Sequence, residues 1–278
     1  MIEYDNVSRR FGNKLAVNAL NLTIEPGELF AFLGPNGAGK TTSIKMLVGL
    51  LRPTEGHVRV CGIDTAESPQ EAARYMGFVP DQPYLYEKLS GREFLSFVGR
   101  LRGLDGADLE SRIEREIDRF ELHDFVDDLA ETYSHGMRQR VVFASAVMHD
   151  PKVLVVDEPM VGLDPKTAWL VKELLRERTA AGNIVFMSTH TLSVAEEIAD
   201  RIGIINHGKL LFLGTIDELR RRRAHESNDA DASTLERLFL AMTAEDLLKT
   251  HAPNGNGKPR NQSDRAPAAS TEGNEVSP

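Results

Sequence analysis

The chain has 278 residues, of which 41% are hydrophobic, so it can bury a sizeable core and form one main domain with an appendage. Its 33 basic and 42 acidic residues give a net charge of −9, which argues against a protein held to nucleic acid by bulk charge, and we expect no nucleic acid partner. Cys61 is the only cysteine, which excludes an internal disulfide bond or a cysteine-cluster metal site and fits a reducing cytosol.

The sequence offers no segment that would enter a membrane. The first residues, MIEYDNVSRR, are polar and lack the apolar core of a signal peptide. No uninterrupted apolar run approaches the about 18 residues that a membrane-spanning helix requires. We therefore expect a soluble chain that reaches a membrane only by docking onto another protein.

The first elements predicted in chain order are strands and short helices. Two strands lie within residues 15–33, with Pro26 and Gly27 as the turn between them. The elements that follow are a helix from Lys40 to about Leu50, a strand at 57–62, a short helix opened by Ser68 and Pro69, and a short strand at 76–80.

Residues 84–132 have a different character, because they are charged and lack strand patterns. Residues 108–120 carry apolar side chains at helical spacing, and Ser90 with Glu93 forms a capping-box pattern. These features predict an all-helical insert at about residues 84–150.

After the insert, strand and helix patterns alternate. The elements are a strand in KVLVVDEP (152–159), a helix opened by Asp164 and Pro165 to about Ala180, a strand in NIVFMSTH (183–190), a helix opened by Ser193 with Glu196, and a hairpin at 201–214. Such alternation indicates parallel strands joined by helical crossovers, and therefore an α/β fold.

The last residues form a separate part. Residues 224–233 are polar and predict a loose linker, and Ser233 with Glu236 opens an amphipathic helix at 234–249. Residues 250–278 hold almost no large apolar side chains and are expected to be disordered. The main domain is then expected at residues 1–223.

One motif in the first strand-to-helix connection predicts a phosphate-binding loop. The segment GPNGAGKTT matches G-x-x-x-x-G-K-[ST], and its residues are Gly34, Pro35, Asn36, Gly37, Ala38, Gly39, Lys40, Thr41 and Thr42. Glycines let backbone N–H groups face phosphates, and the following helix adds its positive end. Lys40 should reach the β- and γ-phosphates, Thr41 should bind Mg²⁺, and Thr42 should touch the α-phosphate. A plain tight turn would need one or two of the glycines, but it would not need the lysine and threonine.

Polar residues at other strand ends complete this site. Asp157 directly follows four apolar residues and should bind the metal through water, while Glu158 should polarise the attacking water. Taken alone, this pair could be a solvated loop start. Gln82 and His190 also follow strands, and each alone could be a capping or surface residue, but parallel strands would bring them to the same ligand.

These residues together resemble the nucleotide-binding subunits of ABC transporters over roughly residues 1–249. Six motifs occur in the family's order: Phe11, the phosphate loop, Gln82, YSHGMRQR (133–140), VLVVDEP, and GLD followed by His190. The resemblance implies a P-loop NTPase core with a mainly parallel sheet, an N-terminal antiparallel β subdomain and an all-helical insert. It implies that Phe11 stacks on adenine, Gln82 senses Mg²⁺, Asp164 communicates across a dimer, and His190 contacts the γ-phosphate.

The segment YSHGMRQR, called the signature segment below, corresponds to the family's LSGGQ motif. The resemblance implies that Ser134 and Gly136 cover a nucleotide held by a second subunit, with the helix dipole favouring its phosphates. An ordinary helix cap would explain Ser134 but not Gly136. Tyr133, His135 and Met137 depart from the motif, and this variant is similar to the export-type branch that pairs with separate membrane subunits.

The resemblance implies an ATP hydrolase that powers a transporter, with ATP and Mg²⁺ as ligands. Its expected partners are a second ABC ATPase subunit and a multi-span membrane subunit at the cytoplasmic face of the cell membrane. Tyr84, Leu85 and Tyr86 are expected to include part of the groove for that subunit, although local core packing is an equal alternative. The remaining alternatives are a non-transport ABC ATPase, such as a cofactor-assembly subunit, and an unrelated P-loop NTPase.

Overall fold

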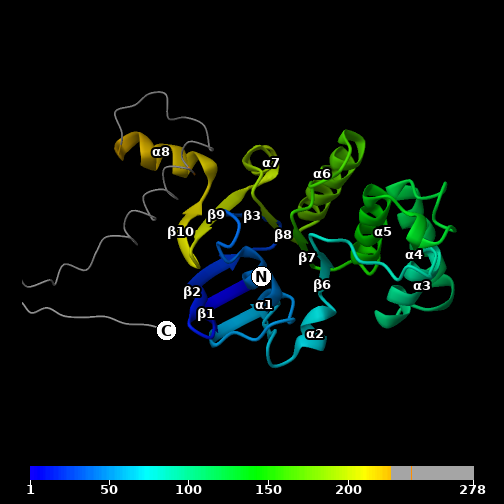
Figure 1. Ribbon diagram of the computed structural model, residues 1–278, viewed down its shortest axis with the longest axis horizontal. Coiled ribbons are helices and arrows are strands. Elements are labelled where there is room, and N and C mark those ends of the chain that lie inside the picture. The colour runs from blue at the N-terminus through cyan, green and yellow to red at the C-terminus, as the bar shows by residue number, and fades with distance from the viewer. Residues whose placement is uncertain (227–238, 240–278) are drawn as a thin grey trace, which may run out of the picture.

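The computed structural model describes residues 1–226 and Phe239 of the chain. The helix predicted at 234–249, the disordered tail predicted at 250–278 and most of the linker predicted at 224–233 lie outside this described part. Within it, Figure 1 shows a central sheet with the N-terminal strands packed beside it and a group of helices at one end.

The central sheet has six strands in the order β10-β9-β3-β8-β7-β6. Their bounds are β3 Leu29–Leu33, β6 Met76–Val79, β7 Val153–Asp157, β8 Ile184–Thr189, β9 Arg201–Asn206 and β10 Lys209–Gly214. All neighbours pair in parallel except β9 and β10, which form the predicted hairpin. The three central strands β3, β7 and β8 are buried along their whole length, as strands covered on both faces must be. The predicted mainly parallel α/β sheet is confirmed.

A second sheet of four strands is antiparallel, in the order β2-β1-β4-β5. Its strands are β1 Ile2–Phe11, β2 Lys14–Ile24, β4 Glu55–Val60 and β5 Ile63–Asp64. The two strands predicted around Pro26 and Gly27 therefore belong to different sheets, because β2 lies in this one and β3 in the central one. The predicted N-terminal antiparallel subdomain is confirmed.

The helices take up the crossovers between strands. They are α1 Lys40–Leu47, α2 Pro69–Ala73, α3 Gly91–Leu101, α4 Gly106–Phe120, α5 His135–Val147, α6 Pro165–Ala180, α7 Leu192–Ile198 and α8 Ile216–Glu226, with a 3₁₀ turn at Ala130–Thr132. Helices α3, α4 and α5 follow one another between β6 and β7 and form the group at one end of Figure 1.

Local capping explains where several helices begin. Ser90 and Glu93 form the predicted capping box at α3, and Asp164 accepts hydrogen bonds from the N–H groups of Lys166 and Thr167 ahead of Pro165 at the start of α6. The prediction for α7 was wrong, because the helix begins at Leu192 and not after Ser193. Thr191 is the residue that precedes the first turn, and its N–H donates to Thr189 Oγ1 at 2.9 Å.

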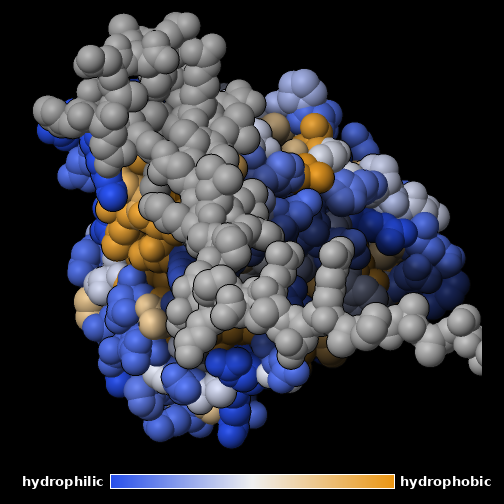
Figure 2. Space-filling view, turned by 60° about the vertical axis from the view of Figure 1, so that its left-hand side comes forward, coloured by the Kyte–Doolittle hydropathy of each residue, from blue (hydrophilic) through white to orange (hydrophobic). Residues whose placement is uncertain are grey.

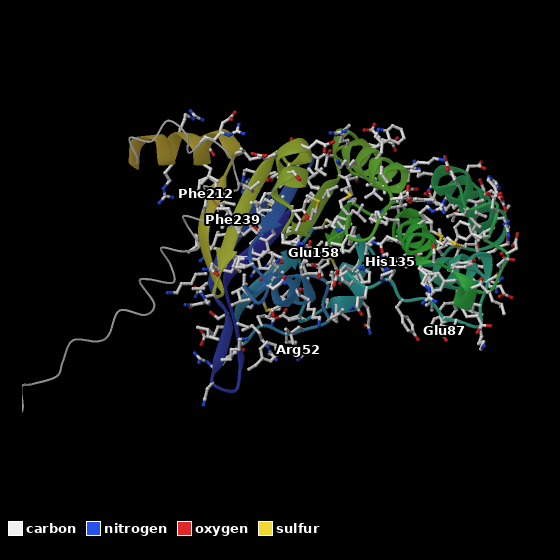
Figure 3. All side chains as sticks on the ribbon, turned by 45° about the horizontal axis from the view of Figure 1, so that its top comes forward. Arg52, Glu87, His135, Glu158, Phe212 and Phe239 are labelled. Carbon is white, nitrogen blue, oxygen red and sulfur yellow. The ribbon has the colours of Figure 1, made fainter. Side chains whose placement is uncertain are left out.

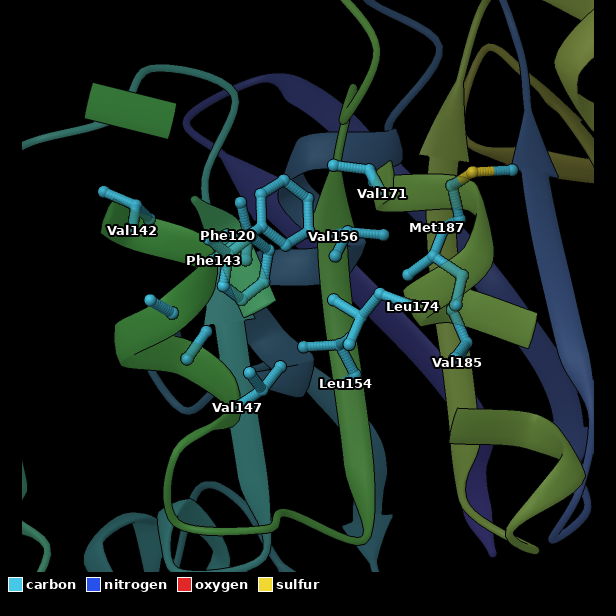
Figure 4. Packing of buried hydrophobic residues seen from close by; sticks show 14 of the residues in the cluster. Phe120, Val142, Phe143, Val147, Leu154, Val156, Val171, Leu174, Val185 and Met187 are labelled. Carbon is cyan, nitrogen blue, oxygen red and sulfur yellow. The ribbon is translucent and has the colours of Figure 1, made fainter. Parts of the chain in front are cut away.

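The core consists of two hydrophobic clusters, one on each face of the central sheet. Alternating residues of a strand divide between them: Leu154 and Val156 of β7 face the helical insert, whereas Val153 and Val155 face the antiparallel sheet. Figure 4 shows the first cluster, in which Phe120 and Phe143 from the insert approach these strands. This cluster joins the insert to the sheet and so fixes the position of the signature segment at the start of α5.

Figure 2 shows a face that is largely hydrophilic, with hydrophobic side chains gathered in a patch beside the grey atoms. Every helix in the described part of the chain is too short or too polar to cross a lipid bilayer.

Candidate active site

The phosphate loop connects the end of β3 to the first turn of α1. Gly39 immediately precedes the helix with φ 118°, and a Cβ there would lie 2.7 Å from the carbonyl oxygen of Ala16, so this position requires glycine. The backbone can therefore turn sharply into the helix, and the free N–H groups of the first turn of α1 point towards the loop. This is the local geometry that binds phosphate at helix N-termini.

A cleft of about 390 Å³ opens along this loop. Its lining residues are Phe11, Lys14, Ala16, Pro35, Asn36, Gly37, Gly39, Lys40, Thr41, Thr42, Asp81, Asp157 and Glu158. A volume of this size accommodates a nucleotide-sized ligand. The cleft thus gathers the aromatic residue, the phosphate loop and the acidic pair that were predicted from separate parts of the sequence.

Lys40 lies at the base of the cleft in a pre-arranged position. Its buried ammonium donates hydrogen bonds to the carbonyl oxygens of Gly34 (2.6 Å) and Pro35 (3.4 Å), and lies 3.7 Å from Oε1 of Glu158. These contacts hold a positive charge beside the loop that would receive phosphate.

Glu158 is held between two strand ends. Its backbone has φ 51°, a conformation that non-glycine residues seldom adopt, and its N–H donates to the carbonyl oxygen of Ser188 at 3.0 Å. Its carboxylate lies 2.9 Å from Nδ1 of His190 and accepts the backbone N–H of the same residue at 3.2 Å. Lys40, Glu158 and His190 therefore form one chain of contacts across the carboxyl ends of β3, β7 and β8, and Glu158 is labelled in Figure 3.

Asp157 is the residue best suited to hold a metal ion. Its side chain is 4% exposed, and burial raises its pKa, opposed in part by the hydrogen bond that Ser188 Oγ donates to it. Because burial disfavours the charged form, the ionised carboxylate destabilises the folded chain once the pH rises above the ordinary pKa of an aspartate. The nearby groups do not fully compensate for the cost of burying this charge. A cation would supply that compensation. Thr41 lines the same cleft, and both side chains offer the oxygen donors that Mg²⁺ prefers, so the residues fit the ion.

Gln82 is not among the described residues that line this cleft. It lines a second pocket of about 570 Å³ together with Asp81, Pro83, Tyr133, His135, Arg138 and Val161. Asp81 borders both cavities and so connects them. The segment after β6 therefore lies between the phosphate loop and the signature segment.

Ser134 and Gly136 lie at the start of α5, outside the described lining of the cleft on their own chain. Ser134 caps the helix, since its Oγ accepts the N–H of Met137 at 3.3 Å. His135, labelled in Figure 3, packs on Gly162, where an added Cβ would lie 3.1 Å from its ring carbon Cδ2. The signature segment and the turn before Asp164 thus contact each other.

Tyr133 anchors the signature segment to the insert. Its buried hydroxyl accepts the N–H of Gly91 at 2.9 Å and lies 2.8 Å from the carbonyl oxygen of Phe125, to which it donates. Burial raises the pKa of this phenol. A leucine, the family's usual residue here, could form neither hydrogen bond.

We expect Tyr133→Phe to lower the free energy of unfolding by about 1–3 kcal/mol, because the N–H of Gly91 would remain buried without a partner. Urea unfolding of the full chain measures this change. Tyr84→Phe, at a side chain that is 71% exposed, is the matched control and should have almost no effect. Equal stability of the two variants would contradict the anchoring role.

Three residues of the cleft had not been singled out from the sequence: Lys14, Ala16 and Asp81. Asp81 could have been found, because it directly precedes Gln82 at a strand end. Lys14 and Ala16 carry no such signal, since they reach the cleft only through the pairing of β1 with β2, in which Lys14 lies opposite Phe11.

The sequence and the structure are similar to those of known ATP-binding proteins. The sequence profile described as "ABC transporter" matches residues 17–161. The daunorubicin/doxorubicin resistance ATP-binding protein DrrA of Streptomyces peucetius is 37% identical over 251 residues, covering 87% of this chain and 76% of that protein. The Nod factor export ATP-binding protein I of Burkholderia lata is 37% identical over 213 residues, covering 77% of this chain and 70% of that protein. The structure also resembles a dimeric ATP-binding cassette in a post-hydrolysis state with ADP and Pi, with a TM-score of 0.71 and 27% identity over 77% of this chain and 98% of that one.

Proposed function

The chain belongs to the ATP-binding, ATP-hydrolysing subunits of the ABC transporters, and we propose that it drives export through a separate multi-span membrane subunit. The direction of transport is supported by relatives whose names refer to export or drug resistance. The chain itself would then lie at the cytoplasmic face of the membrane, attached through its partner.

The observation that carries the catalytic part of the proposal is the chain of contacts from Lys40 through Glu158 to His190 beside the cleft. Phe11 would stack on the adenine ring, and the loop from Gly34 to Thr42 would enclose the phosphates. Lys40 would bind the β- and γ-phosphates, and its existing hydrogen bonds to the loop keep it in place before the ligand arrives.

Thr41 and Asp157 would hold Mg²⁺, with Gln82 reaching the ion from the adjoining pocket. The ion supplies charge neutralisation for the phosphates when bound. Glu158 would orient and polarise the attacking water, since its carboxylate is fixed by His190 and faces Lys40. His190 would stabilise the charge on the transferred phosphate.

The signature segment would act on a second subunit. Ser134 and Gly136 lie at a helix N-terminus, outside the described lining of the cleft on their own chain. Two cassettes facing each other would place each helix start over the phosphates held by the other, where its partial positive charge favours the anion. ATP would then join the subunits, and hydrolysis would separate them, with Asp164 communicating between them.

Two exposed aromatic side chains favour a membrane partner next to this site. Tyr84 and Tyr86 contact each other with ring centroids 5.8 Å apart, and Tyr86 also contacts Phe97, which is exposed as well. Leu85 between them is buried in the core. Core packing therefore describes Leu85, whereas the two exposed tyrosines remain available for a partner. An exposed aromatic cluster is typical of a surface that contacts another protein.

Purification of the chain from detergent-solubilised membranes tests the proposal. We expect a multi-span membrane protein to copurify with the chain, and Tyr84→Ser with Tyr86→Ser to reduce its recovery at least about tenfold by removing the aromatic contacts. ATP binding by the double variant should be unchanged. Copurification with soluble cofactor-assembly proteins alone would instead favour a non-transport ABC ATPase.

A further inference from the structure

The side chain of Arg9 stacks on the ring of Phe11, and Arg9 has no role in the proposed function. The guanidinium carbon of Arg9 lies 4.6 Å from the centroid of the Phe11 ring. The two residues are two positions apart on β1, and this contact shows that their side chains lie on the same side of the strand. Phe11 is 45% exposed and lines the cleft, whereas Arg9 is not among the described residues that line it. One part of the aromatic surface is therefore covered by a cation, and another borders the nucleotide cleft.

Hydrogen bonds hold Arg9 in this position. Its Nη1 donates to the carbonyl oxygen of Arg52 at 2.9 Å, and Arg52 is labelled in Figure 3. The segment that carries this carbonyl is itself tied to β1 on both sides of Arg9, because the N–H of Thr54 donates to the carbonyl of Ser8 and the N–H of Arg10 donates to Thr54 Oγ1. The Nε of Arg9 is buried, with no hydrogen-bond partner in the described structure. A guanidinium that is partly removed from water is stabilised by contact with the face of an aromatic ring.

The hydrogen bond from Arg9 to Arg52 also links the Phe11 ring to the segment that follows the phosphate-binding helix. Helix α1 begins in that loop at Lys40 and ends at Leu47, and Arg52 follows in the connection to β4. Arg9 therefore fixes Phe11 against the segment that leaves the phosphate-binding helix. The phosphate loop and the carbonyl group that holds Arg9 beside Phe11 therefore lie on one continuous segment of the chain, from Gly34 to Arg52.

We propose that Arg9 is a positioning residue for the nucleotide base, which holds the Phe11 ring from the side opposite to adenine. This inference rests on the proposed stacking of adenine on Phe11. A ring already fixed by a cation loses little freedom when a base stacks on it, so the base contributes more to affinity. Arg9 should thus affect nucleotides but not a ligand that has phosphates and no base.

The test compares Mg·ATP with Mg·tripolyphosphate on the full chain by isothermal titration calorimetry. We expect Arg9→Ala to weaken ATP binding about two- to fivefold, the size of a cation–π contact at a partly exposed site, and to leave tripolyphosphate binding unchanged. Arg10→Ala is the matched control, because it removes the same charge at the next residue, which is exposed, whereas the guanidinium over the Phe11 ring is that of Arg9. Arg10→Ala should change the affinities for ATP and for tripolyphosphate less than Arg9→Ala changes the affinity for ATP. Arg9→Lys should retain part of the effect, since an ammonium also interacts with a ring.

Phe11→Ala separates failure of this inference from failure of the proposed site. If Phe11→Ala weakens ATP binding and Arg9→Ala does not, the role of Arg9 is wrong while the adenine site stands. If Phe11→Ala leaves ATP binding intact, the stacking site itself is wrong and the role of Arg9 falls with it. Equal weakening of ATP and tripolyphosphate by Arg9→Ala would show a general charge or folding effect and would also overturn the inference. In the Phe11→Ala background, Arg9→Ala should add no further loss.

Discussion

Replacing Glu158 with glutamine is expected to lower the rate of ATP hydrolysis at least about 100-fold, the contribution that a positioned general base makes. Glutamine has the size of the native side chain and retains an oxygen that can face Lys40, but it cannot polarise water by accepting its proton. ATP binding should remain within about twofold of the native value, because the phosphate loop is unchanged. Steady-state phosphate release measures the first quantity, and titration with ATP measures the second.

The same variant should accumulate as an ATP-bound dimer, since joining the subunits requires ATP and separating them requires its hydrolysis. Size-exclusion chromatography with and without ATP reports this state. Glu173→Gln, at a half-buried position of α6 where the carboxylate pairs with Arg176, is the control and should hydrolyse ATP normally. Hydrolysis by Glu158→Gln at the native rate would remove Glu158 from its role, and a monomer that persists in ATP would argue against the dimer cycle.

Much of this fold and site could be predicted because each feature depends on residues adjacent in sequence. A short apolar run such as VLVV, within a pattern that alternates strands and helices, indicates a buried strand of a parallel sheet, so the polar residues that follow it are expected at the sheet's carboxyl edge. In the structure, Asp157 and Glu158 line the cleft beside the phosphate loop, and Glu158 lies 3.7 Å from the ammonium of Lys40. The hairpin of β9 and β10 and the capping box of α3 were predictable for the same reason.

The remaining features depend on contacts between distant segments. Nothing in the local sequence shows that β1 and β2 carry Phe11 and Lys14 to the cleft, because that follows from the packing of the antiparallel sheet on the central one. Tyr133 is a second case: in the sequence it is one aromatic residue in place of a leucine. In the structure its hydroxyl binds Gly91, far away in the chain. The left-handed backbone of Glu158 likewise depends on Ser188 of the neighbouring strand.

A mixture of two inactive variants should recover activity if each active site is shared between two copies of the chain. Lys40→Ala removes the charge that we propose binds phosphate. Ser134→Asp keeps a residue that caps helices well but places a negative charge where the partner's phosphates should lie. Each variant alone should lose at least about 90% of its hydrolysis rate, because both sites of a symmetric dimer carry the same defect.

In a mixed dimer, one site joins the native phosphate loop of the Ser134→Asp subunit to the native signature segment of the Lys40→Ala subunit, and the other site carries both defects. If subunits exchange freely and sites turn over independently, an equal mixture should recover roughly one quarter of the native rate, because half of the dimers have one complete site. The neutral cap Ser134→Asn separates charge from shape and should lose less activity than Ser134→Asp. Full activity of Ser134→Asp alone, or no recovery in a mixture shown to contain mixed dimers, would mean that a single chain completes its own site. Recovery would instead explain why Ser134 and Gly136 lie outside the described lining of the cleft that their own chain forms.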